Sequence, residues 1–131
     1  MLTAVNIRDH WDRIRPGVQC VISLSKASYR PEDVYAACVQ GLAALYVDDP
    51  GFVILAPQVN VFTGRRELLV WIAWAEGNGI IERYQPEIDD IARREGFEAL
   101  VCWSNRRGFG RVPDWREVAT VYERSVNDAD K

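Results

Sequence analysis

The chain has a single histidine and three cysteines among its 131 residues, and no two cysteines stand at the CxxC spacing. A structural zinc site draws its ligands from closely spaced pairs of these residues, and no such pair is present, so the sequence predicts no metal centre. Cys20, Cys38 and Cys102 each lie in an otherwise apolar segment. We expect them to be buried, reduced thiols of a protein made inside a cell, and we expect His10 at the surface.

Long hydrophobic runs and an excess of positive charge are also absent. No apolar run approaches the roughly 20 residues of a spanning helix, and the N-terminus has no signal-peptide core. Sixteen basic residues stand against 19 acidic ones, so charge gives no basis for binding nucleic acid or an anionic membrane. The composition is that of a folded domain, which we expect over residues 1–126, followed by a polar tail at 127–131.

The first forty residues predict a short strand and helices. Leu2–Val5 has the composition of a short opening strand, and Asn6 is a suitable N-cap for a helix after it. The apolar stripe of this helix is interrupted at Pro16–Gly17 and continues beyond it. A further helix is predicted from Pro31, which is followed by two carboxylates, to Gly41.

The middle of the chain changes to the pattern of strands. Ala43–Val47 and Phe52–Ala56 are apolar runs around an Asp-Asp-Pro-Gly turn, which predicts a hairpin. Pro57 is expected at a strand end or a bulge, because an interior proline removes a donor from the ladder. Leu68–Ala75 is the most apolar run and predicts a buried strand.

The last third predicts one helix between two strands and a final strand. Ile80–Glu95 is amphipathic, and Pro86 inside it suggests that the regular helix begins near Gln85. Ala99–Trp103 should be a short buried strand, parallel to the preceding one through a right-handed βαβ crossover. Ala119–Ser125 favours a last strand. The fold class is therefore α/β (α+β), with a mixed sheet and helices on its faces.

This order of elements resembles the GNAT N-acetyltransferase superfamily and, more narrowly, a small GNAT-like group common in tailed bacteriophages. The segments that carry the resemblance are Leu69–Ile72, Glu76–Gly79, Ile91–Gly96, Leu100–Trp103 and Arg107–Arg111. Their order and spacing cover most of the chain. The resemblance implies one GNAT-like domain whose central sheet is mostly antiparallel, with helices on both faces.

Members of the superfamily that use acetyl-CoA wrap its pyrophosphate with a glycine turn at a helix start. The resemblance places Trp74, Gly77, Asn78 and Gly79 at these cofactor-binding positions. Trp74 stands where a polar residue is usual and Glu76 adds negative charge, so the motif is degenerate. A glycine pair is also common where a chain merely leaves a sheet. We expect no cofactor for a binding domain, and acetyl-CoA for an enzyme.

Acyl transfer to an amine needs a base for the amine and an acid for the departing thiolate. Tyr122 is a candidate for the acid, and Glu76 or Glu67 for the base. Each has an ordinary structural alternative, since a tyrosine in a final strand is usually core and carboxylates beside strands are usually solvated.

A basic loop is the best local candidate for a contact site. Arg106, Arg107 and Arg111 surround Phe109, and guanidinium groups in such a loop bind a phosphate or carboxylate of a ligand or protein. The same arginines have a structural alternative, in which they pair with nearby acidic residues and fix the loop. Trp115, which follows the loop, is a further candidate partner contact.

The tryptophans divide into two expected groups. Trp71 and Trp103 are predicted to be core, because each lies in a buried strand segment. Trp74 and Trp115 are candidate anchors for a partner, since aromatic residues contribute much of the binding energy at interfaces.

Two functions of different classes follow. In the first, the chain is a protein-binding accessory or component of virion assembly, with phage structural proteins as partners, in the host cytoplasm or incorporated in the virion. In the second, it is an acyl-CoA-dependent N-acetyltransferase acting on an amine of host or phage. A small antagonist of one bacterial protein is a third alternative. The degenerate motif and the lack of a basic charge excess favour the first.

Overall fold

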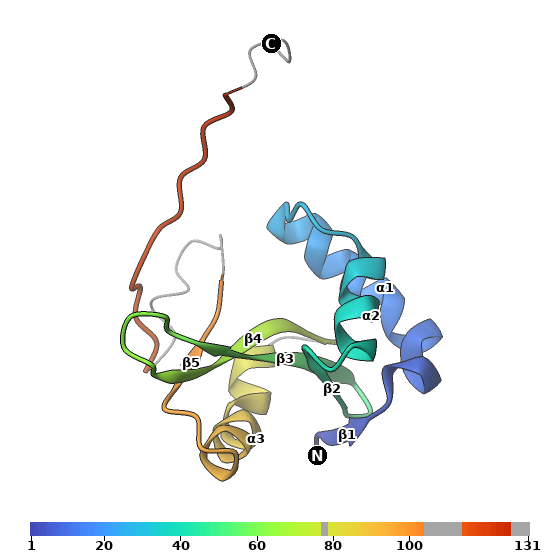
Figure 1. Cartoon of the computed structure of the whole chain (residues 1–131). Helices are drawn as coiled ribbons and strands as arrows, with labels where there is room; N and C mark the ends of the chain where they lie inside the picture. Colours follow the sequence, from blue (N-terminus) through green and yellow to red (C-terminus); the bar gives the residue numbers. More distant parts are fainter. Residues whose placement is uncertain (77–78, 104–113, 127–131) are drawn as a thin grey trace.

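The structure is a computed structural model, and it describes residues 1–76, 79–103 and 114–126. Within these ranges the chain forms helices and strands in an order that Figure 1 follows from blue to orange. They are β1 (Thr3–Val5), α1 (Ile7–Ser25), α2 (Pro31–Val39), β2 (Ala44–Val47), β3 (Gly51–Val59), β4 (Arg66–Ala75), α3 (Ile80–Arg94) and β5 (Ala99–Val101).

The strands form one sheet in the order β1-β2-β3-β4-β5. Neighbours from β1 to β4 are antiparallel, and β4 pairs with β5 in parallel through α3. Helices α1 and α2 cover one face of the sheet, and α3 covers the other (Figure 1). The predicted mixed, mostly antiparallel sheet with helices on both faces and one βαβ connection is therefore confirmed.

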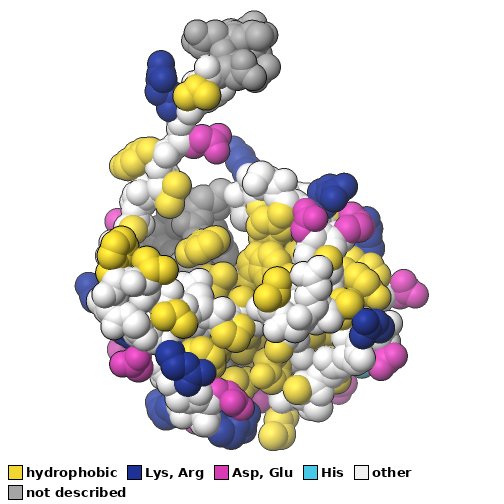
Figure 2. Space-filling model, in the orientation of Figure 1, with side chains coloured by type: hydrophobic (Ala, Val, Ile, Leu, Met, Phe, Trp, Pro, Cys, Tyr) yellow, Lys and Arg dark blue, Asp and Glu magenta, His cyan; other side chains and the backbone are white. Residues whose placement is uncertain are grey.

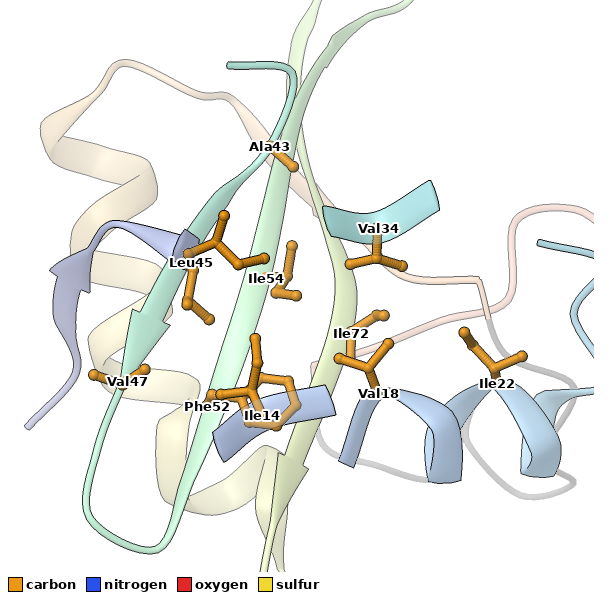
Figure 3. Close-up of a cluster of buried hydrophobic side chains, with 11 residues drawn as sticks. Ile14, Val18, Ile22, Val34, Ala43, Leu45, Val47, Phe52, Ile54 and Ile72 are labelled. Carbon is orange, nitrogen blue, oxygen red and sulfur yellow. The ribbon is translucent and has the colours of Figure 1, made fainter. Parts of the chain in front are cut away.

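Each face of the sheet has its own hydrophobic core, because successive strand residues point to opposite sides. Phe52 and Ile54 of β3 lie under α1 and α2, whereas Val53 and Leu55 lie under α3. Figure 3 shows the first of these cores. Its buried members are Ile7, Ile14, Val18, Ile22, Val34, Ala43, Leu45, Val47, Phe52, Ile54 and Ile72.

Helix α1 runs without interruption through Pro16 and Gly17, so the predicted break is wrong. Pro16 lacks the donor for one intrahelical hydrogen bond, which a helix tolerates when its packing compensates. Gly17 provides that packing. A Cβ at this position would lie 2.8 Å from the ring of Phe52 and 3.0 Å from Trp74, so the glycine brings α1 close to the sheet.

Helix α3 begins at Ile80 rather than near Gln85, and Pro86 lies within it. The buried stripe of Tyr84, Ile88 and Ile91 holds the helix on the sheet on both sides of the proline. Pro86 itself is exposed and removes a single backbone bond. Packing along the whole helix outweighs this local loss.

Pro57 was expected at a strand end or a bulge, but it lies inside β3 and pairs with Leu68. The ladder between β2 and β3 ends at Leu55, so Pro57 occupies a stretch of β3 that β4 alone borders among the described strands. A proline is tolerated on such an edge because its missing donor needs no partner there.

Two predictions about the last third are wrong. Ala119–Ser125 belongs to no helix or strand of the described chain, since a strand needs a partner edge for its backbone groups. We call residues 116–126 the extended arm. Trp103 was expected in the core but is 76% exposed, because β5 ends at Val101.

Cys20, Cys38 and Cys102 were all expected to be buried, but Cys38 and Cys102 are only half-buried and Cys20 is exposed. Cys20 is exposed on α1, which contradicts the expectation of a buried thiol. Cys38 is half-buried, and burial raises its pKa to about 11. No helix in the described ranges is both long and apolar enough to cross a bilayer.

Candidate functional site

Strand β4 loses its pairing with β5 halfway along its length. The parallel ladder runs from Glu67–Ala99 to Leu69–Val101, whereas β4 continues to Ala75. The register with β3 shifts at the same level, because Ile72 pairs with Ile54 and Val70 with Leu55, which leaves Trp71 as an extra residue. A bulge of this kind bends a strand and redirects its side chains. Beyond Leu69, β4 therefore has no ladder partner on the β5 side among the described strands.

The turn that follows β4 leads directly into α3. Gly79 is the N-cap of α3 with φ 74° and makes no side-chain cap, so it is the left-handed position that favours glycine. A Cβ on Gly79 would lie 3.5 Å from a carboxylate oxygen of Glu82. Two of the predicted cofactor residues, Gly77 and Asn78, lie outside the described residues.

A helix N-terminus attracts anions, but the acidic residues described around this turn oppose one. Glu76 is exposed at the end of β4, and Glu82 lies in the first turn of α3. Arg83 is directed at the main chain, where its Nη1 donates to the carbonyl of Glu76 at 3.4 Å. These described residues do not fit a pyrophosphate.

Trp74 packs inside the molecule rather than toward the turn. Its ring stacks on Phe52 with centroids 6.1 Å apart and an interplanar angle of 27°, and it lies against Gly17 of α1. The side chain is half-buried at the edge of the α1 core. Trp71 lies in a similar position, with its ring centroid 5.4 Å from that of Tyr29.

Glu67 is buried in β4, with 6% of its surface exposed. Arg65 donates to one of its carboxylate oxygens at 2.6 and 3.0 Å, and Gln58 donates to the other at 3.2 Å. The hydrogen bonds from Arg65 and then Gln58 lower the pKa of this carboxyl. A lowered pKa weakens a general base, so this environment suits a structural ion pair.

The two alternative candidate bases lie at opposite ends of β4, and the candidate acid lies in the extended arm. Glu67 is the second residue of β4 and Glu76 directly follows its last residue. The nine residue steps between these positions span about 30 Å in a strand. Tyr122 is 89% exposed in the extended arm. Among the described residues, no hydrogen bond joins Tyr122 to either carboxylate.

Trp115 anchors the start of the extended arm to α3. Its indole Nε1 donates to the side-chain oxygen of Gln85 at 2.9 Å, and its ring packs against the α3 core. Trp115, Leu100 and Phe97 line a shallow, open depression beside β5. The other residues predicted to contact a partner, Arg106, Arg107, Phe109 and Arg111, lie outside the described residues.

Sequence reasoning predicted a turn at Thr63–Arg66 but did not single out the exposed apolar residues beside it. We call the turn between β3 and β4 the hairpin tip (residues 60–64). Val61 is 85% exposed and Phe62 is 94% exposed. The available signal was two apolar residues placed directly before a Thr-Gly turn, where polar residues are usual.

No protein-family model matches the sequence, and no curated protein matches it. Solved structures do match in fold. A probable acetyltransferase superposes with a TM-score of 0.70 at 12% identity, covering 98% of this chain and 99% of its own. A ribosomal-protein-alanine N-acetyltransferase from Brucella melitensis biovar Abortus 2308 gives 0.61 at 18% identity, covering 94% and 99%.

An aminoglycoside acetyltransferase from an uncultured soil metagenomic sample, solved with sisomicin, gives a TM-score of 0.66 at 12% identity, covering 97% of this chain and 96% of its own. Identities this low show the fold alone. The chain therefore has a GNAT-like acetyltransferase fold, as the order of its elements predicted.

Proposed function

We propose that this chain is a protein-binding domain built on a GNAT-like fold, without acetyltransferase turnover. The observation that carries the proposal is the hairpin tip, where Val61 and Phe62 are almost fully exposed. A large aromatic side chain presented at the end of a hairpin is the type of residue that anchors protein interfaces.

The hairpin tip is held in one conformation by Asn60. Its side-chain oxygen accepts from the amides of Phe62 at 3.0 Å and Thr63 at 3.1 Å, and its carbonyl accepts from Gly64 at 2.8 Å. Its own amide donates to the carbonyl of Arg65 at 2.9 Å. A preorganised turn loses little entropy when it binds, so this tip is suited to recognition.

The partner that we propose is a structural protein of a phage particle, with this chain as an accessory or component of virion assembly in the host cytoplasm. This part of the proposal rests on the resemblance of the sequence to GNAT-like phage proteins. The ion pair that lowers the pKa of Glu67 and the 89% exposure of Tyr122 support binding over turnover.

Co-elution with purified portal, capsid and scaffolding proteins encoded beside the gene tests the proposal. We expect the wild-type chain to co-elute with one of them and a Val61→Ser/Phe62→Ser variant to fail, with an unchanged melting temperature. Leu24→Ser is the matched control, because Leu24 is an exposed apolar residue of α1. Failure of the wild-type chain to bind any of them, or equal binding by the tip variant, would contradict the proposal.

A second candidate function is acyl-CoA-dependent N-acetyltransfer to an amine. The bulge in β4, the end of its ladder with β5 at Leu69 and the glycine N-cap of α3 favour it, because a phosphorylated ligand of an α/β sheet binds where a strand ends and a helix begins. Glu76 and Glu82 oppose it, as described above.

Thermal unfolding with and without millimolar acetyl-CoA tests this second function, because a ligand that binds only the native state raises the transition. A free adenine nucleotide at equal concentration is the control. The Glu76→Gln/Glu82→Gln variant removes the charges that oppose a phosphate, so a real site should show a larger shift in this variant. No shift in either protein would exclude the turn between β4 and α3 as a cofactor site.

A further inference from the structure

We propose that the depression between α3 and β5 binds an arginine side chain of a partner protein. The inference rests on the proposed function and deepens it, because it names the chemical group that a partner of the hairpin tip presents beside β5. An arginine side chain combines an apolar stem with a guanidinium of five N–H donors. Its site therefore needs an apolar wall and open acceptors of negative charge.

The depression has an apolar wall and a volume of about 400 Å³. That volume lies within the range of small-molecule sites and is ample for one side chain. Its apolar lining residues are Ala92, Phe97, Ala99, Leu100 and Trp115. All of them except the buried Ala92 are half-buried, so they keep surface for a ligand. The methylene stem of an arginine packs on such a wall while its charged end stays at the rim.

The rim of the depression is acidic. Its charged lining residues in the described part of the chain are three carboxylates, Asp89, Glu98 and Asp114, and one base, Arg93. Arg93 is already paired, since its Nη1 donates to Asp90 at 3.1 Å. The depression therefore has an excess of negative charge, which favours a cationic ligand over a neutral or anionic one.

The neighbouring guanidinium of Arg66 does not neutralise this rim. It lies over the ring of Phe97, 4.6 Å from the ring centroid. Its Nη1 donates to the carbonyl of Glu95 at 2.9 Å and to that of Gly96 at 3.3 Å. The charge of Arg66 is therefore directed at main-chain oxygens, and the rim carboxylates are left for another cation.

Asp89 is held in position with an acceptor left open. Nε1 of Trp115 donates to Oε1 of Gln85 at 2.9 Å, and Nε2 of Gln85 donates to Oδ1 of Asp89 at 2.7 Å. Within residues 1–76, 79–103 and 114–126, Oδ2 of Asp89 accepts no hydrogen bond, and neither does the carboxylate of Asp114. A guanidinium suits two such carboxylates, because its planar fork donates in several directions at once.

The described chain leaves the depression open. The extended arm begins directly after Trp115, and every one of its residues is exposed. Figure 1 shows the arm leaving the body, and Figure 2 shows it standing off the surface with apolar side chains spaced along it. No described part of the arm covers the depression, so a partner has access to it.

Glu98 connects the depression with the hairpin tip. It also lines a second hollow at the base of the tip, together with Asn60, Thr63, Gly64 and Arg65. A partner that packs on Phe62 therefore reaches the acidic rim across one continuous surface. An exposed aromatic anchor beside a charged rim is the usual composition of a protein interface, which favours a protein as the source of the arginine.

Titration of the ¹⁵N-labelled full chain with Nα-acetyl-arginine amide tests the site directly. The indole N–H resonance of Trp115 is the reporter, because this group donates to Gln85 at the wall of the depression. We expect a saturable shift of this resonance with the arginine probe. The neutral isostere Nα-acetyl-citrulline amide should give no shift at the same concentration. Equal shifts with the two compounds, or none with either, would overturn the proposal.

Removal of the rim charges gives the second readout. Asp89→Asn/Asp114→Asn should weaken binding of the arginine probe by about tenfold or more, because two charge-assisted hydrogen bonds are lost. Asparagine keeps an oxygen for Gln85 and is tolerated at the φ of 70° that Asp114 adopts, so the fold is retained. Asp9→Asn/Asp12→Asn is the matched control, since it removes the same charge from exposed positions of α1. Equal binding by the rim variant and the control would contradict the site.

The chain's own arginines outside the described residues are the alternative occupants. If one of them fills the depression, Arg106→Gln/Arg107→Gln/Arg111→Gln should bind the probe far more tightly than the wild-type chain does. That result would overturn the proposal. Equal binding by this variant and the wild-type chain would support an arginine supplied by a partner.

The tip variant separates this inference from the proposed function. Val61→Ser/Phe62→Ser should lose the structural-protein partner and still bind the arginine probe as the wild-type chain does. Asp89→Asn/Asp114→Asn should weaken co-elution with that partner at an unchanged melting temperature. A wild-type chain that binds the probe but no structural protein would contradict the proposed function and support the arginine site. Undiminished co-elution of the rim variant would overturn the inference alone.

Discussion

Glu67 shows how strongly the surroundings of one residue decide its role. A carboxylate beside a buried strand is equally compatible in sequence with a general base and with an ion pair. The structure places it under Arg65 and Gln58 with 6% of its surface exposed. Those hydrogen bonds stabilise the ionised form, so the pKa falls and the residue contributes to stability rather than to proton transfer.

We predict that the pH dependence of unfolding reports this pair. The pKa of Glu67 in the folded chain is below its ordinary value of 4.5, so its contribution is present above that pH and is lost as the pH falls through the folded pKa. Glu67→Gln should therefore lower the melting temperature at pH 7, and the difference from wild type should shrink in acid. A constant difference from neutral pH to pH 3 would contradict this assignment.

Tyr84 is a second buried polar residue, and it differs from Glu67 in its hydrogen bonding. Its side chain is 1% exposed, its hydroxyl makes no hydrogen bond with the described groups, and burial raises its pKa. We predict that Tyr84→Phe changes the free energy of unfolding by less than about 1 kcal/mol, because no hydrogen bond is lost. Tyr84→Ala should cost about 3–5 kcal/mol by leaving a cavity. Urea unfolding distinguishes these values, and a large loss in Tyr84→Phe would instead indicate a bond to the nearby Asp48.

At the scale of the elements, α1 contains Pro16, which removes one helical hydrogen bond, and Gly17, which packs closely against the sheet. We predict that Pro16→Ala stabilises the chain by up to about 3 kcal/mol, since it restores a helical donor at an exposed position. Gly17→Ala, one residue away, should destabilise it by about 1–3 kcal/mol, because its Cβ would lie 2.8 Å from the ring of Phe52. Denaturant unfolding of both variants measures the two effects, and a stabilising Gly17→Ala would show that the ring moves aside.

The sequence predicts the elements well where local signals and packing agree. Asn6 caps α1 by accepting from the amide of Arg8 at 2.9 Å, and Pro31 opens α2 as expected. The errors at Pro16 and Pro86 have one cause, since buried stripes that run across each proline outweigh the local loss. The strand expected at Ala119–Ser125 has the right composition, but its formation depends on a partner edge that sequence does not show.

The candidate site was less predictable than the fold for a physical reason. The glycine turn after β4 is visible as a local pattern, and Gly79 has the positive φ that such a turn needs. The packing of Trp74 on Phe52 and Gly17 joins three elements distant in sequence. No local pattern reveals contacts of that kind, and the same holds for the ion pair at Glu67.

At the scale of the whole molecule, the chain has a packed body and an extended arm with different properties. Both faces of the sheet are covered by helices, whereas the arm beyond Trp115 is exposed along its full length. Stability is therefore not uniform, and the arm can change its contacts without unfolding the body. This separation allows variants of the arm to test binding without loss of the fold.

We predict that limited proteolysis detects this division directly. Arg116 and Arg124 lie in the exposed arm, whereas Arg83 and Arg93 lie in the packed helix α3. Trypsin at low protein concentration should cleave after the two arm residues well before it cleaves α3, because cleavage requires an extended, accessible backbone. Mass spectrometry of the fragments gives the order of cleavage. Equal rates in the arm and in α3 would show that the arm is as protected as the body.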